Sequence, residues 1–195
     1  MKKLSNLALA LIAATALGAC AGSKSSSSPV VQNGNPPDWV NRGNGAFKDQ
    51  TGNKVFYGVG ILQGVRNVGL AIPAVDDRGR VEIAKIMNSY VTTLGKDYAN
   101  STTSGDMTKT SEEQMVTQTH KVFAQFQLHG SIPVDHWVDR SDAAHPVYYS
   151  LVKLDMASVQ SALDETKDLD AKTRDYVKAN ADKAFDELNA EQAKH

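Results

Sequence analysis

Hydrophobic positions follow two different periods along the first half of the chain. Residues 55–61 form a short apolar run bounded by turn residues, which predicts a buried strand. A helix is predicted from Asp76 and Asp77, which would cap its start, to about Asn100. Its apolar residues recur at helical spacing and form one stripe, which predicts a buried face: Ile83, Ala84, Met87, Tyr90, Val91, Leu94 and Tyr98.

The pattern changes to alternation after a polar, turn-rich segment. Residues 113–128 predict an antiparallel strand with one covered face, because apolar and polar residues alternate there. Phe123 is the one apolar residue on the polar side of that pattern. Residues 132–139 continue or bend the strand, and Pro133 marks a bulge or an edge.

Two more segments complete the predicted sheet region. Residues 146–155 alternate again and predict the next strand, which residues 141–145 reach through a turn. Residues 41–53 are rich in Gly and Asn and predict a loop.

The chain is helical from Met156, with a predicted break near residues 166–170. The last helix carries an apolar stripe with charges on its other faces: Tyr176, Val177, Ala181, Ala184, Phe185 and Leu188. Such a stripe has two alternative fates. It packs back on the domain as ordinary core, or it projects and pairs with another helix, which makes it a candidate interaction surface.

These elements predict an α+β fold. We expect a compact β-α-β-β domain, with a small antiparallel sheet packed on a helix, followed by a C-terminal helix. The divisions are a signal peptide over residues 1–19, a linker over 20–37, a globular domain over 38–163 and an amphipathic helix over 164–195.

The N-terminus indicates export. Lys2 and Lys3 precede an apolar segment that is shorter than the roughly 20 residues needed to span a bilayer, so it predicts a signal peptide and not a transmembrane helix. The ending Leu17-Gly18-Ala19-Cys20 resembles the lipobox of bacterial lipoproteins. The resemblance implies that Cys20 is lipidated and becomes the mature N-terminus. The alternative is an ordinary secreted protein in which Cys20 is incidental.

Composition limits the remaining function classes. The chain has 21 basic and 22 acidic residues, and removing residues 1–19 takes away two lysines and no acid. A mildly acidic, evenly mixed surface argues against a nucleic-acid partner. Cys20 is the only cysteine, so no disulfide holds the domain. The linker is rich in Ser, Pro, Asn and Gly and would lift the domain clear of lipid headgroups.

Several short motifs in the right order resemble the LPP-twenty family of small outer-membrane lipoproteins of Gram-negative bacteria. Besides the lipobox they are Pro37-Asp38-Trp39-Val40, Phe56-Tyr57-Gly58-Val59-Gly60, Gly79-Arg80-Val81-Glu82-Ile83-Ala84, Trp137 and Tyr148-Tyr149-Ser150-Leu151-Val152-Lys153-Leu154. The resemblance implies an outer-membrane location, facing the periplasm or the cell exterior, and no enzymatic activity. Some relatives are associated with the flagellar motor, and others are surface antigens.

Candidate chemistry is sparse. Five residues around one predicted hairpin end could form a weak metal site or be merely solvated: Asp135, His136, Asp139, Asp142 and His145. Gly58, Gly60 and Gly64 are not followed by a helix start as a dinucleotide site requires, so we expect glycines that admit a close neighbour. No serine carries a nucleophile motif. We expect no enzyme, no catalytic residue, no cofactor and no metal.

Two function classes therefore remain open. The first is a lipid-anchored structural or interaction protein that docks onto an envelope or flagellar-type assembly, or self-associates. The second is a ligand-binding or enzyme-activating lipoprotein with a groove lined by Trp137, Tyr148 and Tyr149, although these aromatic residues could equally be half-buried strand positions.

Overall fold

A four-stranded antiparallel sheet and a long helix define the fold of the computed structural model, which describes residues 35–101 and 109–194. The elements in chain order are α1 (Asp38–Arg42), β1 (Gly45–Lys48), β2 (Lys54–Gln63), α2 (Val68–Ser101), α3 (Lys109–Gly130), β3 (Ile132–Asp139), β4 (Val147–Asp155), α4 (Met156–Glu165) and α5 (Ala171–Gln192). The strands lie in the order β1-β2-β4-β3, with every neighbouring pair antiparallel. The α+β class expected from the sequence is confirmed.

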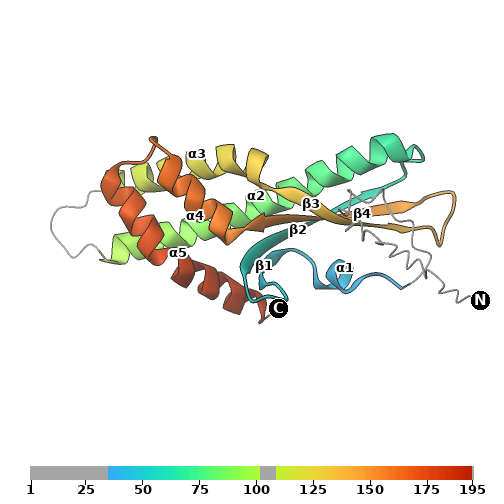
Figure 1. The fold of residues 1–195 in the computed structure, drawn as a ribbon, viewed down its shortest axis with the longest axis horizontal. Coiled ribbons are helices and arrows are strands. Elements are labelled where there is room, and N and C mark those ends of the chain that lie inside the picture. Colours follow the sequence, from blue (N-terminus) through green and yellow to red (C-terminus); the bar gives the residue numbers. More distant parts are fainter. Residues whose placement is uncertain (1–34, 102–108, 195) are drawn as a thin grey trace, which may run out of the picture.

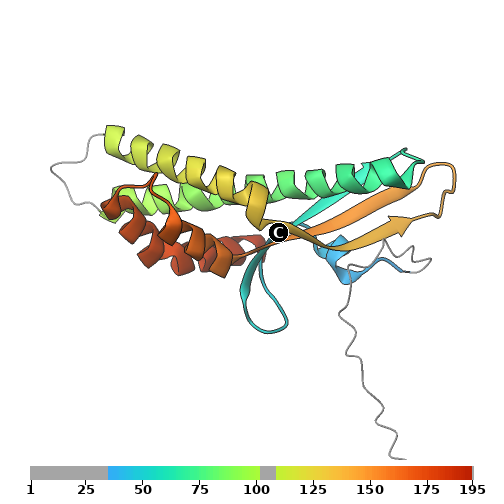
Figure 2. The same ribbon diagram turned by 45° about the horizontal axis from the view of Figure 1, so that its top comes forward.

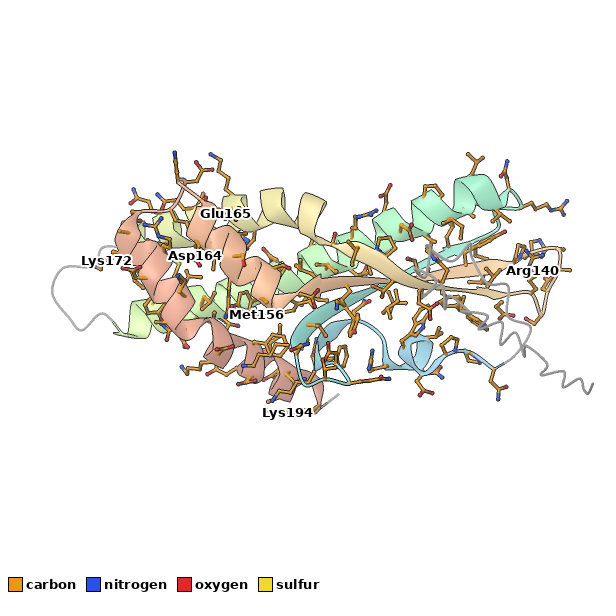
Figure 3. The ribbon with its side chains drawn as sticks, viewed as in Figure 1. Arg140, Met156, Asp164, Glu165, Lys172 and Lys194 are labelled. Carbon is orange, nitrogen blue, oxygen red and sulfur yellow. The ribbon has the colours of Figure 1, made fainter. Side chains whose placement is uncertain are left out.

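Helix α2 runs along the length of the molecule and joins its two ends (Figure 1). Its first half covers one face of the sheet, and its second half lies with α3, α4 and α5 at the other end. Figure 2 shows α2 and α3 side by side there. The side-chain view places Arg140 at the tip of the β3–β4 hairpin and Lys172 at the opposite, helical end (Figure 3). The molecule is therefore elongated, with the sheet and the helical bundle sharing one helix.

Glycines allow α2 to lie unusually close to β2. A Cβ atom on Gly60 would lie 2.0 Å from the Val75 carbonyl oxygen, and one on Gly58 would lie 2.2 Å from the Gly79 carbonyl oxygen. Such contacts do not occur between real atoms, so backbone meets backbone only because side chains are missing. The expectation that these glycines admit a close neighbour is confirmed for Gly58 and Gly60, whereas a Cβ on Gly64 would meet nothing within 4 Å, and Gly64 adopts a φ of 84° after the end of β2.

The predicted start of α2 was wrong. The helix begins at Val68 and not at Asp76, and Pro73 lies inside it. The Asn67 side-chain oxygen accepts from the Gly69 N–H at 2.9 Å and satisfies one of the free donors at the helix start. Pro73 has no N–H, so the Gly69 carbonyl lacks its helical hydrogen bond, and the helix continues past this position.

Helix α3 replaces the strand predicted over residues 113–128. Its buried residues, Met115, Thr119, Val122 and Phe123, lie at helical spacing, and Phe123 packs on Tyr90 of α2 with ring centroids 6.0 Å apart. Phe123, the residue that broke the alternation, belongs to the buried helical face. A stretch with buried positions on one helical stripe gains more by covering α2 than by extending the sheet.

Strand β1 was also missed, because its glycines indicated a loop. Gly45 pairs with Tyr57 and Lys48 with Lys54, which makes β1 and β2 a hairpin. The Asp49 carboxylate accepts from the backbone N–H groups of Thr51 and Asn53, each at 2.9 Å, and fixes the turn. The bulge expected at Pro133 is confirmed, since the β3–β4 register shifts between Pro133 and Asp135.

Helix α5 belongs to the core and not to a separate unit. Phe185 is fully buried against Phe56 of β2, with ring centroids 5.2 Å apart. The Tyr90 hydroxyl donates to the Ala181 carbonyl at 3.1 Å, and burial raises the pKa of Tyr90. One hydrophobic cluster thus crosses the boundary expected at residue 164. Over the described residues, 35–101 and 109–194, no helix is both long and apolar enough to cross a membrane.

Candidate functional site

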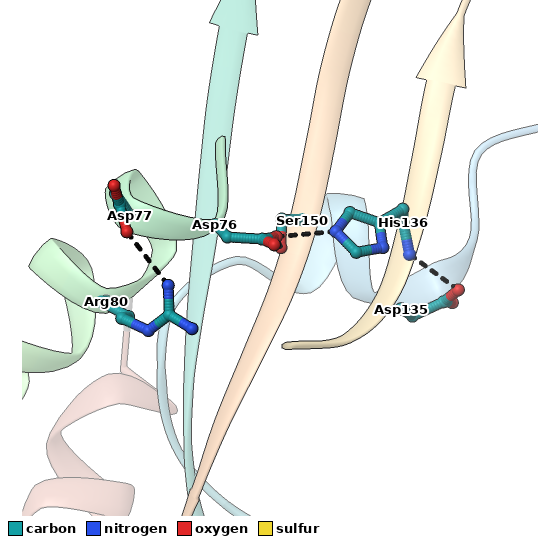
Figure 4. Close-up of polar contacts among 6 residues, drawn as sticks. All are labelled: Asp76, Asp77, Arg80, Asp135, His136 and Ser150. Carbon is teal, nitrogen blue, oxygen red and sulfur yellow. Dashed lines mark hydrogen bonds and ion pairs between the residues drawn. The ribbon is translucent and has the colours of Figure 1, made fainter. Parts of the chain in front are cut away.

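A polar cluster crosses from α2 to the sheet where Asp76 meets two strands (Figure 4). His136 Nε2 of β3 lies 2.6 Å from Asp76 Oδ1, and the Ser150 hydroxyl of β4 donates to the same oxygen at 2.5 Å. His136 and Ser150 are direct cross-strand partners, which places both side chains on the face that α2 covers. The Asp76 and His136 side chains are only 15% and 17% exposed, and Ser150 is fully buried.

The surroundings of Asp76 favour its charged form. Burial alone would raise the pKa of Asp76, but the hydrogen bonds from His136 and Ser150 outweigh it and hold that pKa below its ordinary value. The positive charge of Arg80, which also pairs with Asp77 at 3.0 Å, acts in the same direction. Asp76 is therefore a carboxylate that ties α2 to β3 and β4.

The order of contacts differs from that of a nucleophilic triad. A serine nucleophile needs a base beside its hydroxyl, with the acid behind the base. Here Ser150 donates to Asp76, and Asp76 lies between the serine and His136. The buried Ser150 hydroxyl has no accessible side from which to attack a substrate. The cluster acts as a clamp between elements that lie far apart in the sequence.

The opposite face of the sheet is covered by the first helix. Trp39 of α1 packs with Val59, Trp137 and Leu151, and its indole N–H donates to Asp135 Oδ2 at 2.8 Å. This contact fixes the point at which the chain enters the domain.

The five residues of the candidate metal site are separated by the strand geometry. His136 faces Asp76 under α2, whereas Asp135 lies on the other face and accepts from Trp39. His145 pairs with Asp142 in the turn at 2.9 Å. Among the side chains that the structure describes, no group of three or more metal-ligating residues is close enough to hold an ion.

The predicted aromatic groove is wrong as a single surface. Trp137 and Tyr149 are cross-strand partners on the α1 face, with ring centroids 5.0 Å apart. Tyr148 points to the other face and is buried with Leu62, Val75 and Val138 beneath α2. Adjacent strand residues face opposite sides, so these three residues cannot line one groove.

The stripe on the last helix is likewise not an interaction surface. Val177, Ala181, Ala184 and Phe185 are at most 1% exposed, and Leu188 packs against the same core. Tyr176 packs edge to face on Tyr98 of α2. The stripe therefore packs back on the domain as ordinary core, because its apolar face covers α2 and β2. Cys20 lies outside the described residues.

An open sheet edge is the surface feature that sequence reasoning missed. Strand β2 pairs with β4 through Gln63, but β1 pairs with β2 only as far as Tyr57. The chain leaves the sheet at Asn44 and Gly43, where a φ of 76° turns it toward α1. Among the strands within residues 35–101 and 109–194, none therefore lies on the outer side of residues 58–63 of β2.

Side chains partly replace the missing strand. The Val59 N–H donates to Asn44 Oδ1, and Arg78 of α2 donates to the Ile61 carbonyl, both at 2.5 Å. Because strand residues alternate, Val59 and Ile61 both turn their backbone groups outward, which leaves the Val59 carbonyl and the Ile61 N–H facing the open side. A hollow of about 350 Å³ lies there, lined by Asn44, Val59, Ile61, Arg78, Val81 and Glu82.

Exposed apolar side chains mark this edge. Ile61 is 49% exposed and Val81 of α2 is 53% exposed, and both line the hollow. The other two edges are protected differently. Gln192 and Asn189 of α5 bond both backbone groups of Ala46 on β1, and β3 carries Pro133 and a bulge. We call the surface formed by residues 58–63 of β2 and Arg78, Val81 and Glu82 of α2 the open edge.

Compared with family models, curated proteins and solved structures, the chain matches none.

Proposed function

We propose that this protein is a lipid-anchored envelope protein of a Gram-negative bacterium that docks onto an envelope or flagellar-type assembly through its open edge. The observation that carries the proposal is the unpaired stretch of β2 beside exposed Ile61 and Val81. Unpaired strand edges accept an added strand, whose main-chain hydrogen bonds supply affinity while its side chains supply specificity. The outward Val59 carbonyl and Ile61 N–H can hydrogen-bond to such a strand, and the adjoining hollow can receive its side chains.

The anchor part of the proposal rests on the N-terminal sequence. Leu17-Gly18-Ala19-Cys20 resembles a lipobox, and acyl chains on Cys20 would hold the domain at the outer membrane. The motifs similar to those of the LPP-twenty family support the same location. Residues 21–37 would serve as the tether between lipid and α1.

The proposal assigns no reaction to the polar cluster. Asp76 is fully engaged by His136 and Ser150, which suits a structural clamp. The ligand-binding alternative loses the groove on which it rested, because Tyr148 lies on the opposite face from Trp137 and Tyr149.

Site-specific photo-crosslinking in intact cells tests the proposal. A benzoylphenylalanine at Ile61 should give an adduct with a protein in the outer-membrane fraction. The matched control is the same probe at Ile132, an exposed isoleucine of β3 (52%) that lies on the protected edge. Adducts at Ile61 and not at Ile132 are expected. Equal labelling at both positions, or none at Ile61, would reject docking through the open edge.

A further inference from the structure

We propose that the strand received by the open edge runs parallel to β2, with one residue opposite Gly60, and that Asn44 and Arg78 fix this direction. This inference rests on the proposed function and adds how the partner must pair. The occupant is an extended segment of an envelope protein. Its direction along β2 follows from the hydrogen-bonding groups that the edge leaves open.

Two side chains already occupy hydrogen-bonding groups of the edge. Asn44 Oδ1 accepts from the Val59 N–H at 2.5 Å, as the carbonyl of a neighbouring strand would. Arg78 of α2 donates to the Ile61 carbonyl at 2.5 Å, as a strand N–H would. Asn44 is itself held in place, because its side-chain amide donates to Glu82 of α2 at 3.0 Å. We call Asn44 and Arg78 the caps. They leave the Val59 carbonyl and the Ile61 N–H for a partner.

An antiparallel strand does not fit the two groups that remain. In an antiparallel ladder, the residue opposite Val59 bonds both the N–H and the carbonyl of Val59, and the residue opposite Ile61 does the same there. With the caps in place, each of these partner residues makes one bond and keeps one backbone group unpaired. An unpaired backbone group that is buried costs about as much free energy as a lost hydrogen bond. An antiparallel strand must therefore displace both caps.

A parallel strand fits the same two groups without displacing the caps. In a parallel ladder, one residue donates to the carbonyl just before its opposite residue and accepts from the N–H just after it. For a partner residue opposite Gly60, these groups are the Val59 carbonyl and the Ile61 N–H. The next groups along a parallel ladder are the Val59 N–H and the Ile61 carbonyl, which the caps hold. The caps therefore select one direction and limit the ladder to one partner residue.

The alternation of strand side chains indicates what this partner carries. Helix α2 passes closest to Gly60 at Val75 and Gly79, so the partner residue opposite Gly60 points toward the α2 face. The next partner residue then lies opposite Ile61 and on the same face as its side chain. Ile61 is 49% exposed, and an apolar side chain beside it would cover it. The segment that fits best has an apolar residue at this position.

Photo-crosslinks from the two ends of the open edge in intact cells measure the direction. Benzoylphenylalanine is placed at Val81 in one strain and at Gln63 in another. Val81 marks the Gly58 end, because a Cβ atom on Gly58 would meet Gly79 and Ile83 on either side of it, and Gln63 is the last residue of β2. Mass spectrometry of each adduct identifies the partner residue that reacted. We expect the residue that reacts at Val81 to precede, in the partner's sequence, the one that reacts at Gln63. The reverse order would overturn the inference.

Amide hydrogen exchange in the purified full chain tests the caps without a partner. The Val59 N–H should exchange slowly and the Ile61 N–H fast, although both face the open side. Asn44→Ala should speed exchange of the Val59 N–H at least about tenfold and leave the Ile61 N–H unchanged. The matched control Asn189→Ala removes an asparagine side chain that caps the edge of β1, and should leave the Val59 N–H slow. A slow Gly60 N–H, which faces β4, would show that each variant is folded.

The two proposals fail in different ways. No adduct at Ile61 overturns both. Adducts in the reverse order, including those that join two copies of this chain about a two-fold axis, leave docking through the open edge standing and overturn the parallel direction. A wild-type Val59 N–H that exchanges as fast as the Ile61 N–H overturns the parallel direction alone, because Asn44 then does not cap the edge.

Discussion

The close approach of α2 to β2 makes a sharp prediction for Gly60→Ala. The added Cβ atom would lie 2.0 Å from the Val75 carbonyl oxygen and 2.7 Å from the Gly79 amide nitrogen. Both atoms belong to the helix backbone, so no flexible side chain can move aside. The helix must retreat by about 1 Å to reach a normal contact, which loosens packing along the whole face of the sheet.

The size of the effect follows from these contacts. Overpacking a dense interior typically costs about 1–3 kcal/mol, and a clash with backbone belongs at the upper end, about 3 kcal/mol. Gly79→Ala meets the end of the Val152 side chain at 2.5 Å and gains about 1 kcal/mol of helix propensity, so a smaller net loss is expected. Gly69→Ala meets only the Asn67 side chain, at 3.2 Å, and should be neutral or stabilising.

Urea unfolding followed by circular dichroism measures this series. The free energy of unfolding should fall most for Gly60→Ala, less for Gly79→Ala and not at all for Gly69→Ala, with similar urea dependence for all three. A Gly60→Ala variant within about 0.5 kcal/mol of the wild type would refute the close backbone packing of α2 on β2.

Three further predictions concern the clamp, the last helix and the anchor. Asp76→Asn should lower the free energy of unfolding at pH 7 by about 1–3 kcal/mol, because it removes charged hydrogen bonds. The folded-state pKa of Asp76 lies below the unfolded value of about 3.9, so the wild type should lose this stability as the pH falls through the folded pKa. In Asp76→Asn, the free energy of unfolding should fall less steeply over this acid range. An equally steep fall in the variant would contradict the clamp. Phe185→Ala should cost about 3–5 kcal/mol in urea unfolding, whereas a loss below about 1 kcal/mol would return α5 to the role of a dispensable surface helix. Wild-type cells should incorporate labelled palmitate into the protein and Cys20→Ser cells should not, and label in neither would reject the anchor.

Local sequence patterns correctly predicted the buried stripe of α2 and the position of strand β2. The stripe that includes Met87, Val91 and Leu94 is buried as expected, and the strand at residues 55–61 lies in the sheet. The buried residues are nevertheless divided between the two faces of the sheet. Trp39 and Val59 pack on the opposite face of the sheet from that stripe, and periodicity does not indicate which face of a strand meets which helix.

The misread helix α3 shows why alternation over a short window misleads. Apolar and polar residues alternate over residues 121–128, as in a strand. Over a longer stretch, however, Met115 and Thr119 lie at helical spacing from Val122 and Phe123, and all four are buried. A longer window favours the helix, and the position of Phe123 was the signal. Contact with α2 decides between the two patterns.

The polar cluster and the open edge had no usable local signal. Asp76 was interpreted as a helix cap, yet it bonds His136 and Ser150, which are 60 and 74 residues away. The edge exists because the chain departs at Gly43 while β2 continues to Gln63. Both features depend on how distant segments are placed, which the sequence around each residue does not encode.

Amide hydrogen exchange at Ile61 tests the central claim, that the open edge of β2 is a docking surface, most directly. The Ile61 N–H faces the unpaired side, so in a dilute monomeric chain it should exchange much faster than the Gly60 N–H, which faces β4. When the protein is bound to its envelope partner, the exchange of the Ile61 N–H should become at least about tenfold slower, while that of the Gly60 N–H changes little. An Ile61 amide that exchanges at the same fast rate under all these conditions would contradict the account.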